Sequence, residues 1–315
     1  MSNIEEQNLT EFLLEVKAKM ANITTSENIE ISNINEYVLK NSGKFIRSKI
    51  IYLYGSEIGV RNQKLIELAS AAELIHLSTL IHDDIIDEAD LRRDMPTVVK
   101  KWGIKKAILY GDFLYTKTFQ GLNSFDNTAI ADVLINCAEA LIEGEFNQLK
   151  IKDNSTFSKQ GYFDVIEKKT AVLFSGVLVC LGIEAKLSEK QISELEQLGL
   201  AFGRAFQIND DLSDFKDSKT TGKAEYKDLM EGKLTLPMIF LLESLEKDKQ
   251  KEVLKTVENR NFLQLKETLE NSGCFEKARH ERQVAINHCI EYTERFIKLG
   301  KLNELKVFLN SLLVA

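Results

Sequence analysis

Two acidic clusters contain the residues best suited to chemistry. The first is His82-Asp83-Asp84-Ile85-Ile86-Asp87, and the second is Asp210-Asp211-Leu212-Ser213-Asp214. On a helix, residues four apart project from one face, so Asp83 and Asp87 would lie one turn apart, and Asp90 would extend the acidic stripe. Stacked carboxylates repel each other, and a hard divalent cation offsets that repulsion most directly. One such cluster is more often a solvated face, but two favour a metal site.

Each cluster is expected to end a helix. Apolar periodicity before the first cluster predicts one long helix from about Lys64 to Ala89. Ser188 and Gln191 form a capping box that opens a second helix, which is expected to contain the second cluster and to run to about Asp217. If the two helices face each other across a bundle, their carboxylates can hold metal ions, and Mg²⁺ is the default because every ligand is oxygen. The candidate metal ligands are Asp83, Asp84, Asp87, Asp210, Asp211 and Asp214.

Basic residues accompany the acids along the chain. Arg92 and Arg93 follow the first cluster, where they either neutralise its carboxylates or grip a diphosphate that the metal also binds. Lys169 interrupts a segment apolar enough to be buried, so it calls for an anionic partner. An amphiphile with a diphosphate head and a hydrocarbon tail would satisfy both the cations and the apolar helix faces. The basic candidates are Lys44, Arg47, Arg92, Arg93, Lys169, Lys223 and Lys233.

Some of these residues also have a simpler interpretation. Lys44 and Arg47 lie three apart beside Gly43, near a predicted helix start whose amides favour anions, but such a pair is usually solvated. His76 lies two helical turns before Asp83, where a core histidine and a ligand-facing one are about equally expected.

Composition restricts the class of protein. The 315 residues carry a formal net charge of −7, which argues against a nucleic-acid partner. Two prolines leave long stretches free to be helical, so we expect an all-α fold in a single domain, residues 1–315. The four cysteines lack metal-site spacing and are interpreted as reduced thiols. With no secretory signal and no apolar run of about 18 residues, we expect a cytoplasmic protein without a transmembrane segment.

Amphipathic helices without chemical motifs are expected to surround the two acidic helices. They cover residues 4–22, 33–40, 102–121, 127–149, 238–246, 261–271, 275–297 and 302–314.

The motifs together resemble those of the trans-isoprenyl diphosphate synthases, the polyprenyl synthetase family. The resemblance covers about 195 residues, from Gly43 to Pro237, with its pieces in family order. They are GKFIR at 43–47, ELIH at 73–76, HDDIID with LRR at 82–93, GDFL at 111–114, EGE at 143–145, KT at 169–170, FQINDDLSD at 206–214 and GKLTLP at 232–237.

The resemblance implies a fold and a reaction. The fold would be a large helical bundle of the isoprenoid synthase type with a central apolar tunnel, in a homodimer. The reaction would be a head-to-tail condensation of isopentenyl diphosphate with an allylic diphosphate, through ionisation, condensation and elimination. Mg²⁺ would be required, about three ions per site with substrate bound, with Mn²⁺ as an alternative.

The resemblance also implies residue roles at the matching positions. Mg²⁺ would bind Asp83, Asp84, Asp87 and Asp210. The allylic substrate would contact Arg92, Lys169, Thr170, Gln207, Lys223 and Lys233, with Thr170 and Gln207 stabilising the allylic cation. Isopentenyl diphosphate would contact Lys44, Arg47, His76 and Arg93.

Three positions depart from the family pattern. Tyr226 stands where a glycine is common, so the loop carrying Lys223 is expected to differ in shape. Phe45 and Ser48 replace a more usual basic residue and a proline near the first anion site. No charged site residue is lost, so activity is still expected.

Small residues before the first cluster predict a long product. Thr79 and Ser78 stand four and five residues before Asp83, where bulky residues limit chain growth in this family. We therefore expect an all-trans product of roughly C30 to C40 for a quinone side chain, with Tyr115 or Phe119 closing the tunnel further down. A phenylalanine at position 78 is expected to shorten the product.

Three alternatives remain. The first is a synthase of shorter products, farnesyl or geranylgeranyl diphosphate. The second is a terpene cyclase, which shares the first motif but normally mixes Asn, Ser or Thr with Glu in its second metal motif. The third is a non-catalytic subunit of a heteromeric prenyltransferase, which would be expected to lose catalytic aspartates or basic residues that this chain keeps.

Overall fold

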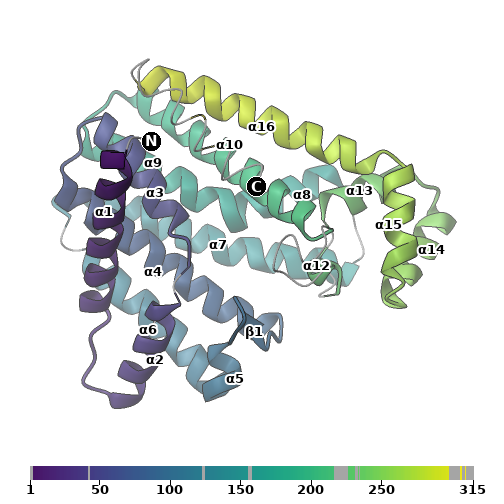
Figure 1. The fold of residues 1–315 in the computed structure, drawn as a ribbon, viewed down its shortest axis with the longest axis horizontal. Coiled ribbons are helices and arrows are strands. Elements are labelled where there is room, and N and C mark those ends of the chain that lie inside the picture. The colour runs from purple at the N-terminus through teal and green to yellow at the C-terminus, as the bar shows by residue number, and fades with distance from the viewer. Residues whose placement is uncertain are drawn as a thin grey trace. The chain divides into compact units, whose positions relative to one another are not determined.

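Helices form nearly all of the described structure (Figure 1). The computed structural model describes residues 3–41, 43–122, 125–154, 158–215, 226–230, 233, 235–297, 306 and 309. Within these ranges, strands are confined to one small hairpin, in which β1 (Leu91–Arg92) pairs antiparallel with β2 (Met95–Pro96). The prediction of an all-α fold is confirmed.

The chain divides into two compact units. Unit 1 comprises Met1–Ala138, Gly176–Glu196 and Phe296–Lys301, and unit 2 comprises Glu139–Ser175, Gln197–Arg295 and Leu302–Ala315. The first aspartate cluster lies in unit 1 and the second in unit 2. The single domain, the central tunnel and the facing of the two clusters stay predictions.

Unit 1 is built around α4 (Asn62–Ile86). The helices α1 (Asn3–Ile23), α3 (Ile46–Glu57) and α6 (Ile104–Leu122) pack against it (Figure 1). Most α4 side chains are buried, as expected for a helix with neighbours on several sides. Among the described helices, α4 alone is long and apolar enough to cross a membrane, and 72% of its apolar window is buried inside the structure. The absence of a transmembrane segment stays a prediction.

The end of α4 differs from the predicted one. The helix stops at Ile86, and Glu88 adopts a left-handed φ of 50° that breaks the helical ladder. Asp90 therefore does not extend the acidic stripe on the helix, and that prediction is wrong. Its carboxylate pairs instead with Lys100, 3.0 Å away. The chain then enters the β1–β2 hairpin, which places Arg92 beside the end of α4.

Two shorter helices complete the N-terminal part of unit 1. They are α2 (Ile29–Lys40) and α5 (Val98–Trp102). Asn28 caps α2, since its side chain accepts hydrogen bonds from two backbone amides of the first turn.

The long helices α7 (Thr128–Asn154), α9 (Val172–Glu184) and α10 (Glu189–Ser213) are each divided between the two units. The predicted capping box at the start of α10 is confirmed. The Ser188 amide donates to Gln191 Oε1 at 3.1 Å, and the Gln191 amide donates to Ser188 Oγ at 3.4 Å.

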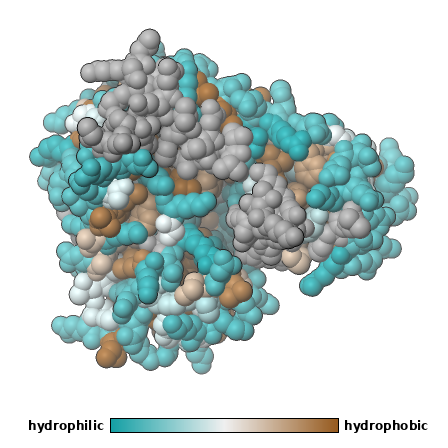
Figure 2. All heavy atoms as spheres, viewed as in Figure 1, coloured by the Kyte–Doolittle hydropathy of each residue, from teal (hydrophilic) through white to brown (hydrophobic). Residues whose placement is uncertain are grey.

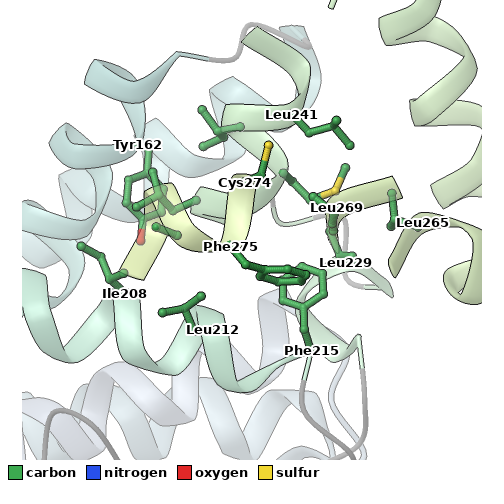
Figure 3. Close-up of a cluster of buried hydrophobic side chains, with 14 of the residues drawn as sticks. Tyr162, Ile208, Leu212, Phe215, Leu229, Leu241, Leu265, Leu269, Cys274 and Phe275 are labelled. Atoms are coloured by element: carbon green, nitrogen blue, oxygen red, sulfur yellow. The ribbon is translucent and has the colours of Figure 1, made fainter. Parts of the chain in front are cut away.

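Unit 2 has a hydrophobic core of its own (Figure 3). Side chains from α10, such as Ile208 and Leu212, pack there with Phe215, Leu265 and Phe275. The remaining described elements of unit 2 are α8 (Lys159–Ile166), η1 (Glu167–Ala171), α12 (Lys227–Met230), α13 (Leu236–Glu243), α14 (Lys247–Glu258), α15 (Phe262–Asn271) and α16 (Cys274–Phe296).

Sequence patterns located most helices but missed α14. Its apolar stripe is short: Val253 and Val257, one turn apart, pack partly buried against the core of unit 2, and none of its side chains is fully buried. Most of the predicted helix at 302–314 lies outside the described residues. Polar and charged side chains cover much of the face seen in Figure 2, with apolar groups between them. All four cysteines are free and buried.

Candidate active site

The first aspartate cluster occupies the C-terminal end of α4. Asp83 and Asp84 lie in its last turn and Asp87 is its C-cap residue, while no basic residue lies in that turn. Carboxylates are disfavoured there, because the unpaired carbonyls give a helix C-terminus a partial negative charge. The sequence of the helix therefore creates a strong local demand for cations.

Arg92 meets part of that demand. Asp84 is 3% exposed, and its Oδ1 atom lies 2.8 Å from both Nε and Nη2 of Arg92. Internal neutralisation, one of the two alternatives for Arg92, therefore occurs in this structure. Asp83 and Asp87 are partly exposed.

His82 joins this end of α4 to α6. Its ring lies so close to Gly111 that a Cβ atom there would be 2.3 Å from Nε2. The glycine of the GDFL motif is thus explained by close helix packing. Nε2 also lies 3.5 Å from Asp112 and 3.4 Å from the Ile108 carbonyl oxygen.

Three arginines of unit 1, Arg47, Arg92 and Arg93, lie near His76 of α4 and act on its charge. Arg47 is 7% exposed, and burial, opposed by Glu73, lowers its pKa to about 10. Burial and the charges of Arg47, Arg92 and Arg93 hold the pKa of His76 well below its usual value, so this histidine is neutral at pH 7. Positively charged groups gathered in this way fit a dianionic ligand.

The backbone before α3 is shaped around Arg93. Gly43 has a φ of +95°, and a Cβ atom there would lie 2.4 Å from the Arg93 guanidinium. Arg93 Nη1 donates to the Asn41 carbonyl oxygen at 2.8 Å. Lys44, next in the chain, is exposed. The structure thus brings Lys44, Arg47 and Arg93 into one region of unit 1. Their binding of isopentenyl diphosphate stays a prediction.

The second aspartate cluster repeats the placement of the first. Asp210 and Asp211 lie at the C-terminal end of α10, whose last turn contains no basic residue. Asp211 is 4% exposed, and it accepts hydrogen bonds from Tyr162 Oη at 2.8 Å, Gln207 Nε2 at 3.0 Å and the Leu236 amide at 3.1 Å. Burial and the nearby Asp228 raise its pKa to about 7. Asp211 therefore ties α8, α10 and α13 together.

Asp214 lies just beyond the C-terminal end of α10 and accepts hydrogen bonds from the segment at residues 226–228. Its Oδ1 accepts the Asp228 amide at 3.3 Å, and its carbonyl oxygen accepts the Tyr226 amide at 2.9 Å. Tyr226 has a φ of 58°, the left-handed conformation that glycine adopts most readily, which explains why glycine is common at this position. Lys223 lies outside the described residues, and the Lys233 amide donates to the Asp228 carbonyl oxygen at 2.8 Å.

The Lys-Thr motif lies in η1, a π-helical turn, a feature that frequently marks functional sites. Lys169 forms an ion pair with Glu145 and donates to Gln148 Oε1 at 3.0 Å. Thr170 Oγ1 donates to Gln207 Oε1 at 2.8 Å. The sequence predicts roles for Lys169, Thr170 and Gln207, and the structure brings the last two into direct contact.

A glycine lets this π-helical turn approach its neighbour. A Cβ atom at Gly144, in the EGE motif, would lie 2.8 Å from Lys168 Cβ and 2.9 Å from Lys169 Cγ. The packing of α7 on η1 therefore requires glycine there.

The donor set fits Mg²⁺ by chemistry. All candidate ligands are carboxylate oxygens at helix ends that need positive charge. Among the described residues, no three His, Cys, Asp or Glu side chains gather closely enough to hold a metal ion by themselves. Mg²⁺ usually binds through one or two carboxylates together with water and substrate phosphates, so a preassembled cage is not needed.

The residues predicted to set chain length lie where α4 meets α6. Ser78 is fully buried, and its hydroxyl donates to the Gly111 carbonyl oxygen at 2.7 Å. Tyr115 lies within hydrogen-bonding reach of Ser78, and burial, with the charge of Asp83, raises its pKa to about 12. Tyr115 therefore lies at the level of Ser78, not deeper as the sequence suggests. Phe119 stacks on Tyr115 with ring centroids 5.7 Å apart.

Sequence reasoning gave no role to several residues that hold the site. Tyr162 donates to Asp211, Glu145 pairs with Lys169, and Glu73 accepts hydrogen bonds from Ser48. Glu73 gave one usable signal, a carboxylate within an otherwise apolar run. Glu145 gave another, because it stands in the EGE motif and Lys169 calls for an anionic partner. The contact of Tyr162 with Asp211 spans 49 positions and has no such signal.

The chain is similar in sequence to known proteins of the family that its motifs resemble. Residues 28–271 match the Polyprenyl synthetase family. The chain is 35% identical over 210 residues to the octaprenyl diphosphate synthase of Escherichia coli (strain K12), a match spanning 66% of this chain and 65% of that protein. It is 31% identical over 296 residues to the geranylgeranyl diphosphate synthase of Saccharolobus solfataricus, spanning 91% of this chain and 88% of that protein.

Solved structures share the fold. A decaprenyl diphosphate synthase from Rhodobacter capsulatus superposes with a TM-score of 0.90 at 27% identity, over 98% of this chain and 97% of that one. A polyprenyl synthase from Caulobacter crescentus CB15, complexed with calcium and isoprenyl diphosphate, gives 0.89 at 24% identity, over 98% and 96%. The family predicted from the sequence is confirmed, and the chain belongs to the polyprenyl synthetase family.

Proposed function

We propose that this chain is a trans-prenyl diphosphate synthase, which joins isopentenyl diphosphate to an allylic diphosphate in a Mg²⁺-dependent head-to-tail condensation. The observation that carries the proposal is the placement of both aspartate clusters at C-terminal ends of long helices without basic residues in the last turn. Cations must come from elsewhere, and a metal–diphosphate complex supplies them. The relatives are named for prenyl diphosphate synthesis, which supports the proposal.

The metal ligands proposed are Asp83, Asp87 and Asp210, which are partly exposed. Asp84 and Asp211 have carboxylate oxygens held by other protein groups, so we assign them first to positioning the helix ends. Bound Mg²⁺, about three ions with substrate present, would neutralise the diphosphate that leaves.

Residues of unit 2 would act on the allylic substrate. Lys169 would bind its diphosphate, and the carbon–oxygen bond would then break with the electron pair leaving on the diphosphate. The oxygen atoms of Thr170 and Gln207, already fixed by their mutual hydrogen bond, would stabilise the allylic cation. We assign Arg92, Lys223 and Lys233 to the same substrate.

Residues of unit 1 would hold isopentenyl diphosphate. Lys44, Arg47, His76 and Arg93 would bind its diphosphate by charge and hydrogen bonds. The double bond of this substrate attacks the allylic cation and forms the new carbon–carbon bond. A proton is then lost from the adjacent carbon to the departed diphosphate, so no side-chain nucleophile is required.

Chain length has two candidate ranges. The small side chains of Ser78 and Thr79 support a product of roughly C30 to C40. The position of Tyr115 beside Ser78 favours a shorter product such as geranylgeranyl diphosphate, because a bulky ring meets the growing chain early.

A second copy of the chain is the proposed partner. On α6, Ile104, Ile108 and Leu109 are 43–68% exposed. On α7, Ile142 and Phe146 recur at helical spacing and are 50% and 70% exposed. Large exposed apolar side chains on neighbouring turns mark interaction surfaces, so we propose a homodimer through these faces.

Release of diphosphate tests the reaction class. Purified chain is incubated with farnesyl diphosphate, isopentenyl diphosphate and Mg²⁺, and each is omitted in turn. Release that needs all three is expected. Release from farnesyl diphosphate alone would indicate a cyclase or a phosphatase, and no release would indicate a non-catalytic subunit.

A further inference from the structure

One buried carboxylate, that of Glu73 on α4, lies near two arginines proposed to bind isopentenyl diphosphate. Glu73 is 5% exposed and is surrounded along α4 by buried Ala72 and Leu74. Its Oε1 atom accepts two hydrogen bonds from Ser48, one from the backbone amide at 3.0 Å and one from the hydroxyl at 3.0 Å. An acid in an apolar run is costly to bury, so its contacts call for explanation.

The Ser48 amide that donates to Glu73 has no hydrogen-bond partner within α3 itself. This helix begins at Ile46, and its N-cap residue, Phe45, has a φ of 52° and makes no side-chain capping hydrogen bond. Ser48 is the third residue of the helix, where the amide has no partner within the helix. Glu73 therefore supplies from α4 the cap that α3 lacks, and its negative charge faces the positive end of the helix.

Glu73 also acts electrostatically on two arginines of the site. The charge of Glu73 opposes the lowering of pKa that burial imposes on Arg47 and Arg93. Arg47 immediately precedes Ser48 in the chain, so fixing Ser48 also fixes the backbone that carries Arg47. His76 follows one turn later on α4 and completes the same group.

We propose that Glu73 is a positioning residue for isopentenyl diphosphate, holding the start of α3 through Ser48 so that Arg47 is presented to the diphosphate. This rests on the proposed function.

The test measures each substrate separately. Binding of isopentenyl diphosphate is measured by calorimetry, and KM values for both substrates are measured in wild type, Glu73→Ala, Glu73→Gln and Ser48→Ala. Glu67→Gln is the matched control, because Glu67 lies on the same helix but pairs with Lys64, 3.2 Å away. Circular dichroism melting shows whether each variant is folded.

A selective loss is expected. Glu73→Ala should weaken isopentenyl diphosphate binding about tenfold, and Ser48→Ala about threefold, with the allylic KM changed less than about twofold. Glu73→Gln, which keeps an acceptor for Ser48, should recover part of the affinity. The control should match wild type.

Other outcomes would overturn the inference. Wild-type affinity in Glu73→Ala, or an equal loss for both substrates, would show that Glu73 serves stability alone. If Glu73→Ala does not fold, unchanged affinity in folded Ser48→Ala would overturn it. If the wild-type chain is active and the variants bind isopentenyl diphosphate with wild-type affinity, only this inference is contradicted. If the wild-type chain is inactive, the proposed function is contradicted.

Discussion

Arg92 holds Asp84 through two nitrogen atoms of one guanidinium, each 2.8 Å from the same carboxylate oxygen. Asp84 is also buried, whereas Asp83 and Asp87 on either side of it are partly exposed. Asp84→Asn should lower stability by about 1–3 kcal/mol, because it weakens the partner of a half-buried arginine. It should leave the Mg²⁺ concentration for half-maximal activity within about threefold of wild type.

Asp83→Asn gives the contrast. Loss of a direct ligand should raise that Mg²⁺ concentration about tenfold or more. Activity measured against Mg²⁺ concentration, with thermal melting in parallel, separates the two effects. Equal shifts of the Mg²⁺ curve in both variants would show that Asp84 is itself a ligand.

Tyr115 is predicted to limit the length of the product. Tyr115→Ala should lengthen the main product by about one or two five-carbon units, because the ring is removed beside Ser78. Tyr115→Phe is the control, since it keeps the ring and should keep the product. Reversed-phase separation of the dephosphorylated products measures this, and identical profiles in wild type and Tyr115→Ala would exclude Tyr115 as the barrier.

Ser78→Phe is a poorer test than the sequence suggests. Ser78 is fully buried against α6, and a ring forced into that contact should destabilise the protein by about 1–3 kcal/mol. A shorter product from this variant is informative only if its melting temperature stays near that of wild type.

The lowered pKa of His76 should make the stability of the protein depend on pH. Its pKa in the folded protein is well below the unfolded value near 6.5, so below pH 6.5 the unfolded chain binds more protons than the folded one. The free energy of unfolding should therefore fall as pH falls, by up to about 1.4 kcal/mol per pH unit from this group. Urea unfolding of wild type and His76→Gln between pH 7.5 and 5 measures the difference. Parallel curves would show that His76 titrates normally.

Tyr226 combines a strained backbone with a packed side chain. Its left-handed φ costs about 1 kcal/mol relative to glycine, while its ring packs against Phe215 with centroids 6.0 Å apart. Tyr226→Ala keeps the strain and loses the packing, so it should be destabilised by more than Tyr226→Gly. Urea midpoints measure the order, and a more stable Tyr226→Ala would show that the backbone carries no strain.

The sequence predicts which residues of the site carry the chemistry better than it predicts where the helices end and which residues these side chains contact. Spacing alone placed the aspartates near helix ends, because periodicity and a capping box are local signals. The stop at Ile86 rather than Ala89 was not predictable, since the left-handed Glu88 has no distinctive side chain. Whether Arg92 serves a carboxylate or a substrate depends on the hairpin that carries it, which a two-residue strand does not signal.

The supporting contacts depend on packing. Tyr162 reaches Asp211 across 49 positions, and Ser48 reaches Glu73 across 25. Many residues of the sequence could accept a hydrogen bond from a given hydroxyl or amide. The packing of the helices decides which of them does.

The central claim is that this chain extends an allylic diphosphate by five-carbon units in a Mg²⁺-dependent reaction. Its most direct test is incubation of the purified chain with farnesyl diphosphate, radiolabelled isopentenyl diphosphate and Mg²⁺, followed by dephosphorylation and chromatography of the prenyl alcohols. We predict labelled all-trans products longer than the primer, with the main one between geranylgeraniol and octaprenol, and none after chelation of the metal. The absence of any labelled product longer than the primer, in a run where a known prenyl synthase is active, would contradict the claim.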